Sequence, residues 1–418
     1  MTVRDTYPGD QYNRTKTVGI NTITLSGVDI RQLLVTMIIY EDLFAHFTTI
    51  ELTISDPIGM TEDPGIFSKE DLVISFESTE GDFPAYSKSF KVYKIDNMTN
   101  ASEGSKNKLY TIHGTTEGAF ANIEKRASRC WKDLKEDEIV SDICQNVLGI
   151  KVETETCLND RYFVAPNIRP VSVIQEMCRS AVRQNGYPTC NYIFYEDKHG
   201  HKFKSIDYLI EQGKSHKIRH GIAAQVSNDK YARLNARSYS NINTYDFFKN
   251  VDQGMYGTRV FYVDLHGKKE YDYKDYIYSG EFGGQAKIDG ANDKLMKSPP
   301  GFPEQKIMFG SRHQGPQPPE YSTHFADEYQ HKRLSIMQQF DNNGYLVDVD
   351  GDTKVELGQI VEFELPSYDS RGDKGGAFVQ KEDKKYSKNY LVAQIRHHVN
   401  QEEHRMILGL IKHQLKSG

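Results

Sequence analysis

The order of two hydrophobic periodicities along the chain limits what it can fold into. Toward both ends, apolar and polar residues alternate, which is the pattern of strands with one buried face. The alternating apolar positions near the N-terminus are Ile50, Leu52, Ile54, Leu72, Ile74 and Phe76. In the middle, apolar residues recur at helical spacing, at Ile174, Met177, Cys178, Ala181 and Val182. The pattern predicts a β-rich α+β chain with a sheet domain, then a mixed α/β unit, then further strands.

Turn and cap residues mark the elements of the middle unit. Pro170 near the start and Gly186 just past the end predict a helix between them. An earlier helical face is expected to stop at Gly149, because glycine favours the left-handed conformation that ends helices. Residues 192 to 206 are expected to form a hairpin that turns around Asp197 to Gly200.

The second half of the chain is expected to return to strands. Arg259 to Val263 and Tyr271 to Tyr278 have strand character. Residues 279–321 hold six of the 14 prolines and predict a long loop or arm without regular structure. A helix is expected from Ala326 to Phe340, with Leu334, Met337 and either Ile336 or Phe340 facing inward. The last predicted strands are 344–349, 359–365, 390–399 and 405–411.

Charge and composition exclude several classes of protein. The 418 residues suit about two to four domains. The net charge of −6 argues against a nucleic-acid binder with an exposed basic surface. All of that charge comes from residues 1–115, which hold 10 Lys and Arg against 16 Asp and Glu. The 26 tyrosines suit sheet surfaces and large protein contacts.

The cysteines and the N-terminus indicate a reducing compartment. The five cysteines are odd in number, lack a C-x-x-C pair and lie in one stretch, at Cys130, Cys144, Cys157, Cys178 and Cys190. Neither a disulfide framework nor a zinc site is expected, and Cys144 and Cys178 should be structural thiols on inward helix faces. No apolar run is long enough for a secretory signal or a membrane span.

Two short motifs resemble ligand sites but lack required positions. Gly213-Lys214-Ser215 ends like a phosphate-binding loop, yet Tyr208 stands where the first glycine is needed. Residues 348–352 begin like a calcium loop, but Thr353 and Gln359 replace its glycine and its bidentate glutamate. We therefore expect an ordinary loop and an acidic strand turn.

Histidines and carboxylates give no clear catalytic pattern. The histidines considered are His199, His201, His397, His398, His404 and His413. His397 and His398 are neighbours on a predicted strand and should face opposite sides, so polar or interface-facing imidazoles are expected rather than a metal site. A paired-carboxylate hydrolase site stays open as an alternative, without a motif that supports it. The segment from Arg371 to Lys388, with a net charge of +3, suits a solvated loop or contact with an acidic partner. No catalytic, cofactor-binding or metal-binding residue is predicted, and no interface residue is assigned.

Several sequence segments, in the same order along nearly the whole chain, resemble segments of the central baseplate hub proteins of contractile-tailed bacteriophages, the T-even-type hub. The fold of that family recurs in the first part of type VI secretion spike proteins. The segments are residues 39–59, 195–205, 247–264, 357–361, 389–392 and 395–398.

The resemblance implies a fold and a domain plan. It implies two antiparallel β-barrels like those of tail-tube proteins, with a helix-containing domain inserted in the first, and a trimer that forms a pseudo-sixfold ring. The expected domains are the first barrel (1–115, completed by 216–240), the inserted domain (116–215), the start of the second barrel (241–278), the arm (279–321), a helix packing on the inserted domain (322–342) and the rest of the second barrel (343–418).

The resemblance also implies a function. The chain would be a non-enzymatic hub in the virion tail baseplate, assembled in the cytoplasm of the bacterial host. It would join a threefold central spike to a sixfold tail tube, start tube assembly and form part of the DNA ejection channel. The implied partners are two further copies of the chain, the tail tube protein and the spike protein, with tape measure, wedge and sheath-initiator proteins as further candidates. Double-stranded DNA would be in transit only, no cofactor is implied, and no membrane insertion is expected. The alternatives are a hub or spike component of a tailocin or secretion system, and a tail-associated polysaccharide or peptidoglycan hydrolase.

Overall fold

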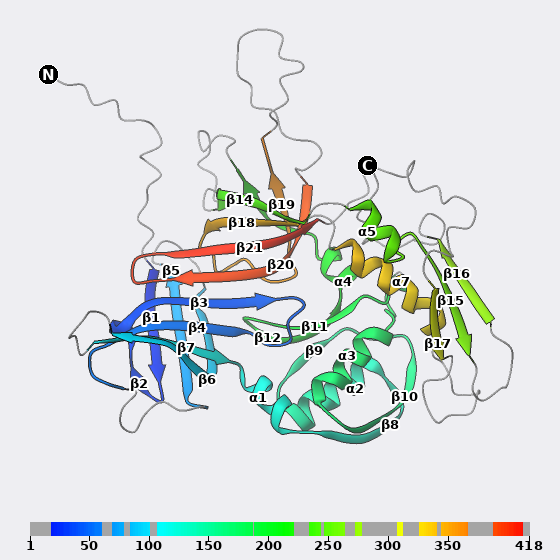
Figure 1. Ribbon diagram of the computed structural model, residues 1–418, viewed down its shortest axis with the longest axis horizontal. Coiled ribbons are helices and arrows are strands. Elements are labelled where there is room, and N and C mark those ends of the chain that lie inside the picture. The colour runs from blue at the N-terminus through cyan, green and yellow to red at the C-terminus, as the bar shows by residue number, and fades with distance from the viewer. Residues whose placement is uncertain are drawn as a thin grey trace, which may run out of the picture.

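The structure is a computed structural model in which antiparallel strands dominate and helices gather in the middle of the chain (Figure 1). It describes residues 18–60, 69–78, 84–100, 107–186, 188–220, 234–243, 246–263, 272–277, 307–311, 326–340, 344–366 and 388–412. The N-terminal tail, the segment 367–387 with nearly all of the predicted basic loop, and most of the predicted arm lie outside these residues, as does His413.

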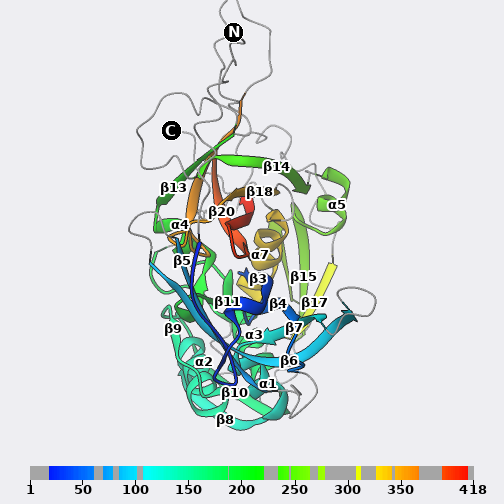
Figure 2. The same cartoon turned by 90° about the vertical axis from the view of Figure 1, so that its left-hand side faces the viewer.

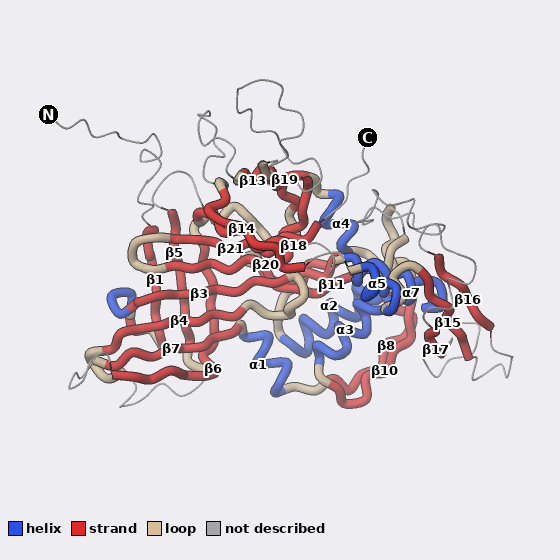
Figure 3. Tube along the Cα trace, turned by 45° about the horizontal axis from the view of Figure 1, so that its top comes forward, coloured by secondary structure: helices blue, strands red, loops and turns tan. Residues whose placement is uncertain are grey.

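One sheet of 13 strands dominates the molecule (Figure 3). Two groups of strands build it, one from the N-terminal part of the chain and one from its middle and C-terminal parts. The N-terminal group consists of β1 (Val18–Leu25), β2 (Val28–Asp29), β3 (Leu34–Asp42), β4 (Thr49–Asp56), β5 (Asp71–Ser78), β6 (Tyr86–Asn100) and β7 (Lys108–Thr115), with a short 3-10 helix at Arg31–Leu33. The C-terminal group consists of β13 (Lys214–Arg219), β14 (Ala236–Asn243), β18 (Gly344–Asp350), β19 (Ile360–Glu364), β20 (Lys388–Val399) and β21 (His404–Lys412).

Strand β20 joins the two groups because it has two partners along one edge. Its first residues pair with β19, from Lys388 to Leu391, and its last residues pair with β3, from Gln394 to Val399. The change of partner coincides with an irregularity in its pairing with β21 between Val392 and Gln394. The sheet therefore forks at Ala393, whose carbonyl accepts a hydrogen bond from the backbone N–H of Leu43.

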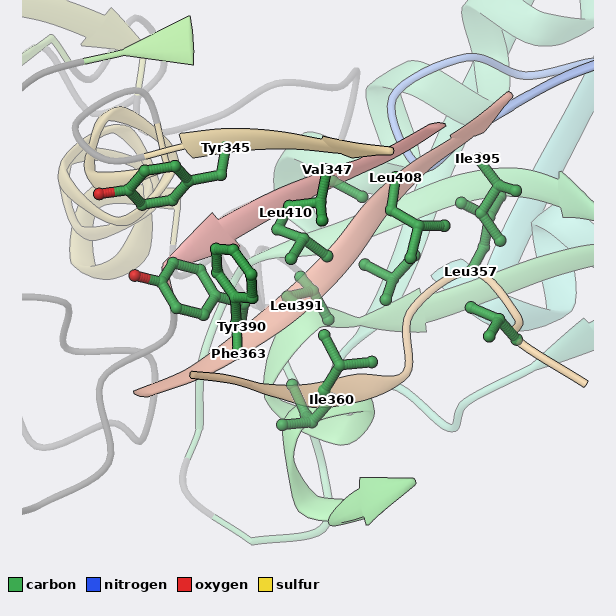
Figure 4. Packing of buried hydrophobic residues seen from close by; sticks show 14 of the residues in the cluster. Tyr345, Val347, Leu357, Ile360, Phe363, Tyr390, Leu391, Ile395, Leu408 and Leu410 are labelled. Atoms are coloured by element: carbon green, nitrogen blue, oxygen red, sulfur yellow. The ribbon is translucent and has the colours of Figure 1, made fainter. Parts of the chain in front are cut away.

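Each group of strands encloses its own hydrophobic core. The N-terminal core contains Met37, Ile39, Ile50, Leu52 and Ile112, and among the described residues of the C-terminal group Val399 alone belongs to it. In the C-terminal core, the rings of Tyr345, Phe363 and Tyr390 pack edge to face, and Figure 4 shows them among the aliphatic residues of the same core. Both cores lie on the same face of the strands that run from β18 to β7.

The middle of the chain forms a separate layer beside the sheet (Figure 2). Its strands are β8 (Ala127–Lys135) paired with β10 (Asp160–Ile168), and β11 (Tyr192–Asp197) paired with β12 (Gly200–Ser205), to which β9 (Val152–Thr154) adds in parallel. Its helices are α1 (Glu117–Glu124), α2 (Glu136–Asp142), a π-helix at Ile143–Leu148, α3 (Pro170–Ser180) and α4 (Ile206–Glu211). All of these elements except α4 border a core that includes Cys144, Cys157 and Cys178, whereas α4 buries Ile206, Leu209 and Ile210 in the C-terminal core.

A third unit holds the segments that follow β14. It consists of α5 (Phe247–Asp252), the sheet of β15 (Gly257–Val263), β16 (Asp272–Ile277) and β17 (Ile307–Ser311), and α7 (Ala326–Gln339). Helix α7 buries Ser335, Ile336 and Phe340, whereas Leu334 and Met337 are half-buried. The helix also contacts the middle unit, since Arg333 donates hydrogen bonds to the carbonyls of Cys190 and Tyr192 at 2.8 and 3.0 Å.

Several local predictions are confirmed and one is wrong. The hairpin of β11 and β12 turns at the expected place, and the helical segment after α2 ends at Gly149, whose φ of +77° is left-handed. Helix α3, however, ends at Ser180 rather than beside Gly186, because Ala181 already has extended dihedrals. Arg183 then forms a bridge with Cys157, so Ala181 and Val182 are buried from an extended segment.

The structure also assigns several strands differently from the expected domains. Strands β13 and β14 overlap the segment 216–240 that was expected to complete the first barrel, but they pair with β19 and β18. Burial of Ile218 and Ala236 in the C-terminal core explains this pairing. Strands β15 and β16, expected to open the second barrel, form their own sheet under α7. The predicted arm contains a strand, β17, because residues 307–311 pair in parallel with β15.

The shared core face predicts unequal costs for two leucines on neighbouring strands. Leu408 on β21 is fully buried, whereas Leu346 on β18 is 36% exposed on the opposite face. Leu408→Ala should lower the free energy of unfolding by about 2–5 kcal/mol, and Leu346→Ala by less than about 0.5 kcal/mol. Urea unfolding followed by the fluorescence of Trp131 measures both, and equal losses would contradict the assignment of the buried face.

Candidate functional site: a buried polar junction

Charged and polar side chains gather where the hairpin of β11 and β12 meets both groups of the main sheet. The contributing strands are β3, β6, β11, β12, β20 and β21. The buried members are Glu41, Lys88, Glu196, Asp197, His201, His397 and His404. Burial of this many ionisable groups is costly unless they are paired, so their partners decide whether the junction is stable.

Lys88 is the central cation of the junction. Its Nζ lies 3.2 Å from Oε1 of Glu196 and donates to the carbonyl of Asp197 at 2.6 Å and to Oγ1 of Thr48 at 2.8 Å. The second oxygen of Glu196 accepts from the backbone N–H of Thr48 at 2.9 Å and from Oγ1 of Thr116 at 2.7 Å. Glu196, on β11 of the middle unit, is thus bound to the N-terminal group of the main sheet through Lys88 and Thr48.

Glu41 extends the junction toward the C-terminal strands. It accepts a hydrogen bond from the hydroxyl of Tyr86 at 2.8 Å, and the Tyr86 ring lies 5.1 Å from the ring of His397. Burial raises the pKa of Glu41 to about 7, although the charge of Lys88 opposes the shift. Glu41 therefore takes up a proton near neutral pH in the folded chain.

His397 and His404 form a buried imidazole pair at the other end of the junction. Nδ1 of His397 lies 3.0 Å from Nε2 of His404, a distance at which one ring donates and the other accepts. Burial lowers the pKa of His404 to about 3, and burial together with His404 lowers that of His397 well below its ordinary value. Gly351 packs against this pair, since a Cβ at that position would lie 2.1 Å from Nδ1 of His404.

The loop after β18 contacts the turn of the β11–β12 hairpin. Glu356 accepts from Nζ of Lys198 at 2.8 Å and lies 3.0 Å from Nε2 of His199. Lys198 also donates to the carbonyl of Thr353 at 2.7 Å, and the Thr353 hydroxyl donates to the carbonyl of Pro84 at 2.7 Å. Three distant parts of the sequence are therefore tied together at one loop.

The contacts of the junction suit a structural role, in which it holds parts of the chain together, and not an open catalytic site. Its carboxylates are buried and engaged by Lys88, Tyr86 and backbone groups. The surface hollow beside it has one carboxylate, Glu153, among its lining residues, together with Lys151, His199 and Lys202. That hollow therefore lacks the pair of facing carboxylates that a glycosidase needs.

A second feature is the polar outer face of the main sheet, opposite both cores. From β14 to β6, successive strands contribute half-buried or exposed residues at alternate positions. Threonines are frequent on it, at Thr36, Thr49, Thr53, Thr111 and Thr115. Its charged residues include Asp42, Glu51, Lys91, Lys94, Asp96, Asp348, Asp350, Arg237, Arg396 and Arg405.

The structure places the residues singled out from the sequence at separate sites. Gly213 leads into strand β13, not into the helix that a phosphate-binding loop requires. Asp348 and Asp350 end β18 and pair with Arg405 and Arg237, as expected of an acidic strand turn. Cys144 and Cys178 are buried as predicted, and Cys130 is exposed. Among the described residues, no group of three or more His, Cys, Asp and Glu could hold a metal ion.

The histidines are only partly as expected. His397 and His398 face opposite sides of β20, and His398 lies 3.3 Å from Oγ1 of Thr36 on the outer face. The expectation of polar or interface-facing imidazoles is wrong for His201, His397 and His404, which are buried. The hydrophobic alternation could have identified the junction, because Glu41, Lys88, His397 and His404 all fall at inward positions of their strands.

Sequence comparison with known proteins shows which proteins the chain is similar to. No family model matches the chain. A probable baseplate hub protein of Vibrio phage KVP40 is 23% identical over 222 residues, which is 51% of each chain. The resemblance to baseplate hub proteins is confirmed. The chain matches about half the length of that hub protein.

Solved structures of tail proteins share the fold. A tail protein from Neisseria meningitidis superposes with a TM-score of 0.58 at 10% identity, covering 94% of this chain and 96% of that one. A 43 kDa tail protein of a Shewanella oneidensis prophage gives a TM-score of 0.53 at 9% identity, covering 95% and 98%. The mostly antiparallel architecture is therefore that of phage tail proteins.

Removing the central cation should destabilise the joint. Lys88→Met leaves Glu196 buried beside hydrogen-bond donors but without its cation, and losing one partner of a buried pair costs about 3–5 kcal/mol. Lys94→Met, on the same strand, removes a solvent-exposed cation beside Asp96 and should cost far less, because water screens exposed ion pairs. Urea unfolding measures both, and similar costs would show that the buried pair contributes nothing special.

The histidine pair predicts a loss of stability in acid. Unfolded histidines bind protons below about pH 6.5, whereas the folded pair resists protonation until far lower pH, so stability should fall as the pH drops from about 6.5. Glu41 acts oppositely between about pH 7 and its unfolded value near 4.5, because the folded state then binds the extra proton.

The two contributions can be separated by substitution. Glu41→Gln should make the acid loss of unfolding free energy steeper, and His404→Gln should make it shallower by up to about 1.4 kcal/mol per pH unit. Leu346→Ala, which removes no titratable group, is the control and should leave the slope unchanged. Parallel pH profiles for all four chains would contradict the role assigned to the pair.

Proposed function

We propose that the chain is a structural hub of a phage contractile-tail baseplate and forms part of the channel through which DNA is ejected. The observation that carries the proposal is the combination of a sequence match to a protein named as a baseplate hub and a tail-protein fold over 94% of the chain. These relatives are named as a baseplate hub protein and as tail proteins, and we propose that this chain is not an enzyme.

The architecture supports a subunit with two similar parts. The six strands around the C-terminal core follow one another as β14, β18, β21, β20, β19 and β13, and a bridge from Arg219 to Asn235 links the last strand to the segment before the first. We propose that each group of strands closes as a tube-like barrel. Three chains would then present six similar barrels and match a threefold spike to a sixfold tube, from which tube assembly would start.

The outer face of the main sheet is proposed to line the channel. It is broad, polar and continuous across both groups of strands, so it could pass a duplex without offering an apolar surface for partners to bind. Double-stranded DNA would be a passenger and not a bound ligand.

The proposed setting follows from the same role. The partners would be two further copies of the chain, the tail tube protein and the central spike, with tape measure, wedge and sheath-initiator proteins as further candidates. The proposed location is the tail baseplate of the virion, after assembly in the host cytoplasm. Among the helices that the structure describes, none is long and apolar enough to cross a membrane.

A hub or spike component of a tailocin or secretion system is the second candidate. The shared tail-protein fold favours it equally, because the fold alone does not say whether DNA passes through. A tail-associated hydrolase is the third, and the engaged carboxylates of the junction count against it.

The molar mass in solution together with a low-resolution particle image tests the proposal. We expect about three times the 47.9 kDa of one chain and a threefold ring with a central channel. A monomer with an open cleft that cleaves cell-wall polymer would overturn it in favour of the hydrolase. A ring of the same shape from a gene cluster without a capsid would favour the tailocin or secretion system.

A further inference from the structure

The acidic segment and the outer face of the sheet do not have the same electrostatics. The net charge of the chain comes from residues 1–115, so an outer face dominated by carboxylates would be expected there. Instead, acidic and basic side chains alternate on that face, at distances that place them in contact.

The contacts pair cations with carboxylates on the same face. Arg405 forms an ion pair with Asp348, and Arg237 with Asp350 at 2.7 Å. Lys94 pairs with Asp96 two residues along β6, and His113 lies 3.8 Å from Glu51 and 4.0 Å from Asp96. The pairs lie on β6, β7, β14, β18 and β21, and thus belong to both groups of strands.

The remaining charged residues of the face are also engaged. Arg396 lies over the ring of Tyr40 at 5.3 Å, and the Tyr40 hydroxyl donates to Glu51 at 3.1 Å. Asp42 accepts from the side-chain amide of Gln394 at 2.8 Å. The described face therefore offers a passing polyanion few cations that are not already held by a neighbour.

We propose that these carboxylates restrain the cations of the outer face, so that the face does not bind the phosphates of double-stranded DNA. The inference rests on the proposed function for its setting, a channel that DNA crosses. Its physical basis is counterion release, because each cation that is free to neutralise a phosphate adds salt-dependent affinity. A conduit with free arginines would hold DNA, whereas one with paired arginines lets it slide.

Removing the carboxylates and keeping the cations tests this inference. The variant Asp96→Asn, Asp348→Asn, Asp350→Asn should bind a fluorescent 30-base-pair duplex at low salt at least tenfold more tightly than the unmodified full chain, as measured by anisotropy. Its affinity should fall with salt, with a slope of about 0.9 for each freed cation that meets a phosphate.

A matched control separates the face from net charge. Asp29→Asn, Glu124→Gln, Glu153→Gln changes the charge equally but frees cations at dispersed places, since these residues pair with Arg31, Lys69 and Lys204. Equal binding by both variants would overturn the inference, as would no binding by the first.

A second pair of variants tests the inference if the triple variants do not fold. Leu346→Lys adds a cation to the face without removing a carboxylate, whereas Ile123→Lys adds one on helix α1. Only the first should raise duplex affinity, and equal effects would overturn the inference. A monomer with an open cleft would overturn the proposed function and leave these binding results unchanged, so the two failures can be told apart.

Discussion

The backbone pairing of β20 is the constraint on which the rest of the structure depends. One edge of this strand bonds first to β19 and then to β3, so the two groups of strands become one sheet only through its last six residues. The fork fixes the orientation of both cores, and places His397 next to Tyr86 and Glu41. The buried junction exists because of this geometry, since its members come from strands that meet only there.

Ionisable groups in the junction trade stability for specificity of assembly. An apolar cluster would hold the middle unit and the two groups of strands together at a smaller desolvation cost. It would also tolerate arrangements in which a strand has slipped in register. Lys88 has three named partners from two segments, Thr48 on one side and Glu196 and Asp197 of the hairpin on the other. A shift of the hairpin by one residue would separate Lys88 from Glu196. We infer that the charges specify one arrangement of the units. Gly351 contributes to the same specificity by allowing the loop to lie directly on His404.

Local features could be predicted from the sequence and long-range pairing could not. The alternation at Ile50, Leu52 and Ile54, the hairpin turn and the stop at Gly149 each depend on neighbouring residues, and the structure has them. The partners of β13 and β14 depend on strands more than a hundred residues away, about which periodicity carries no information. The junction was missed because Glu41 and Lys88 were considered as charges and not as inward positions of their strands.

The late position of β20 also governs how the chain folds during synthesis. Strand β3 pairs with residues more than 350 positions later, as the contact of Thr36 with His398 illustrates. The N-terminal core can form early, because nearly all of its residues precede β8. The open edge of β3, however, stays without its partner until β20 has left the ribosome. Such an edge is a template for wrong pairing between nascent chains, so correct assembly of this protein depends on what covers β3 during that interval.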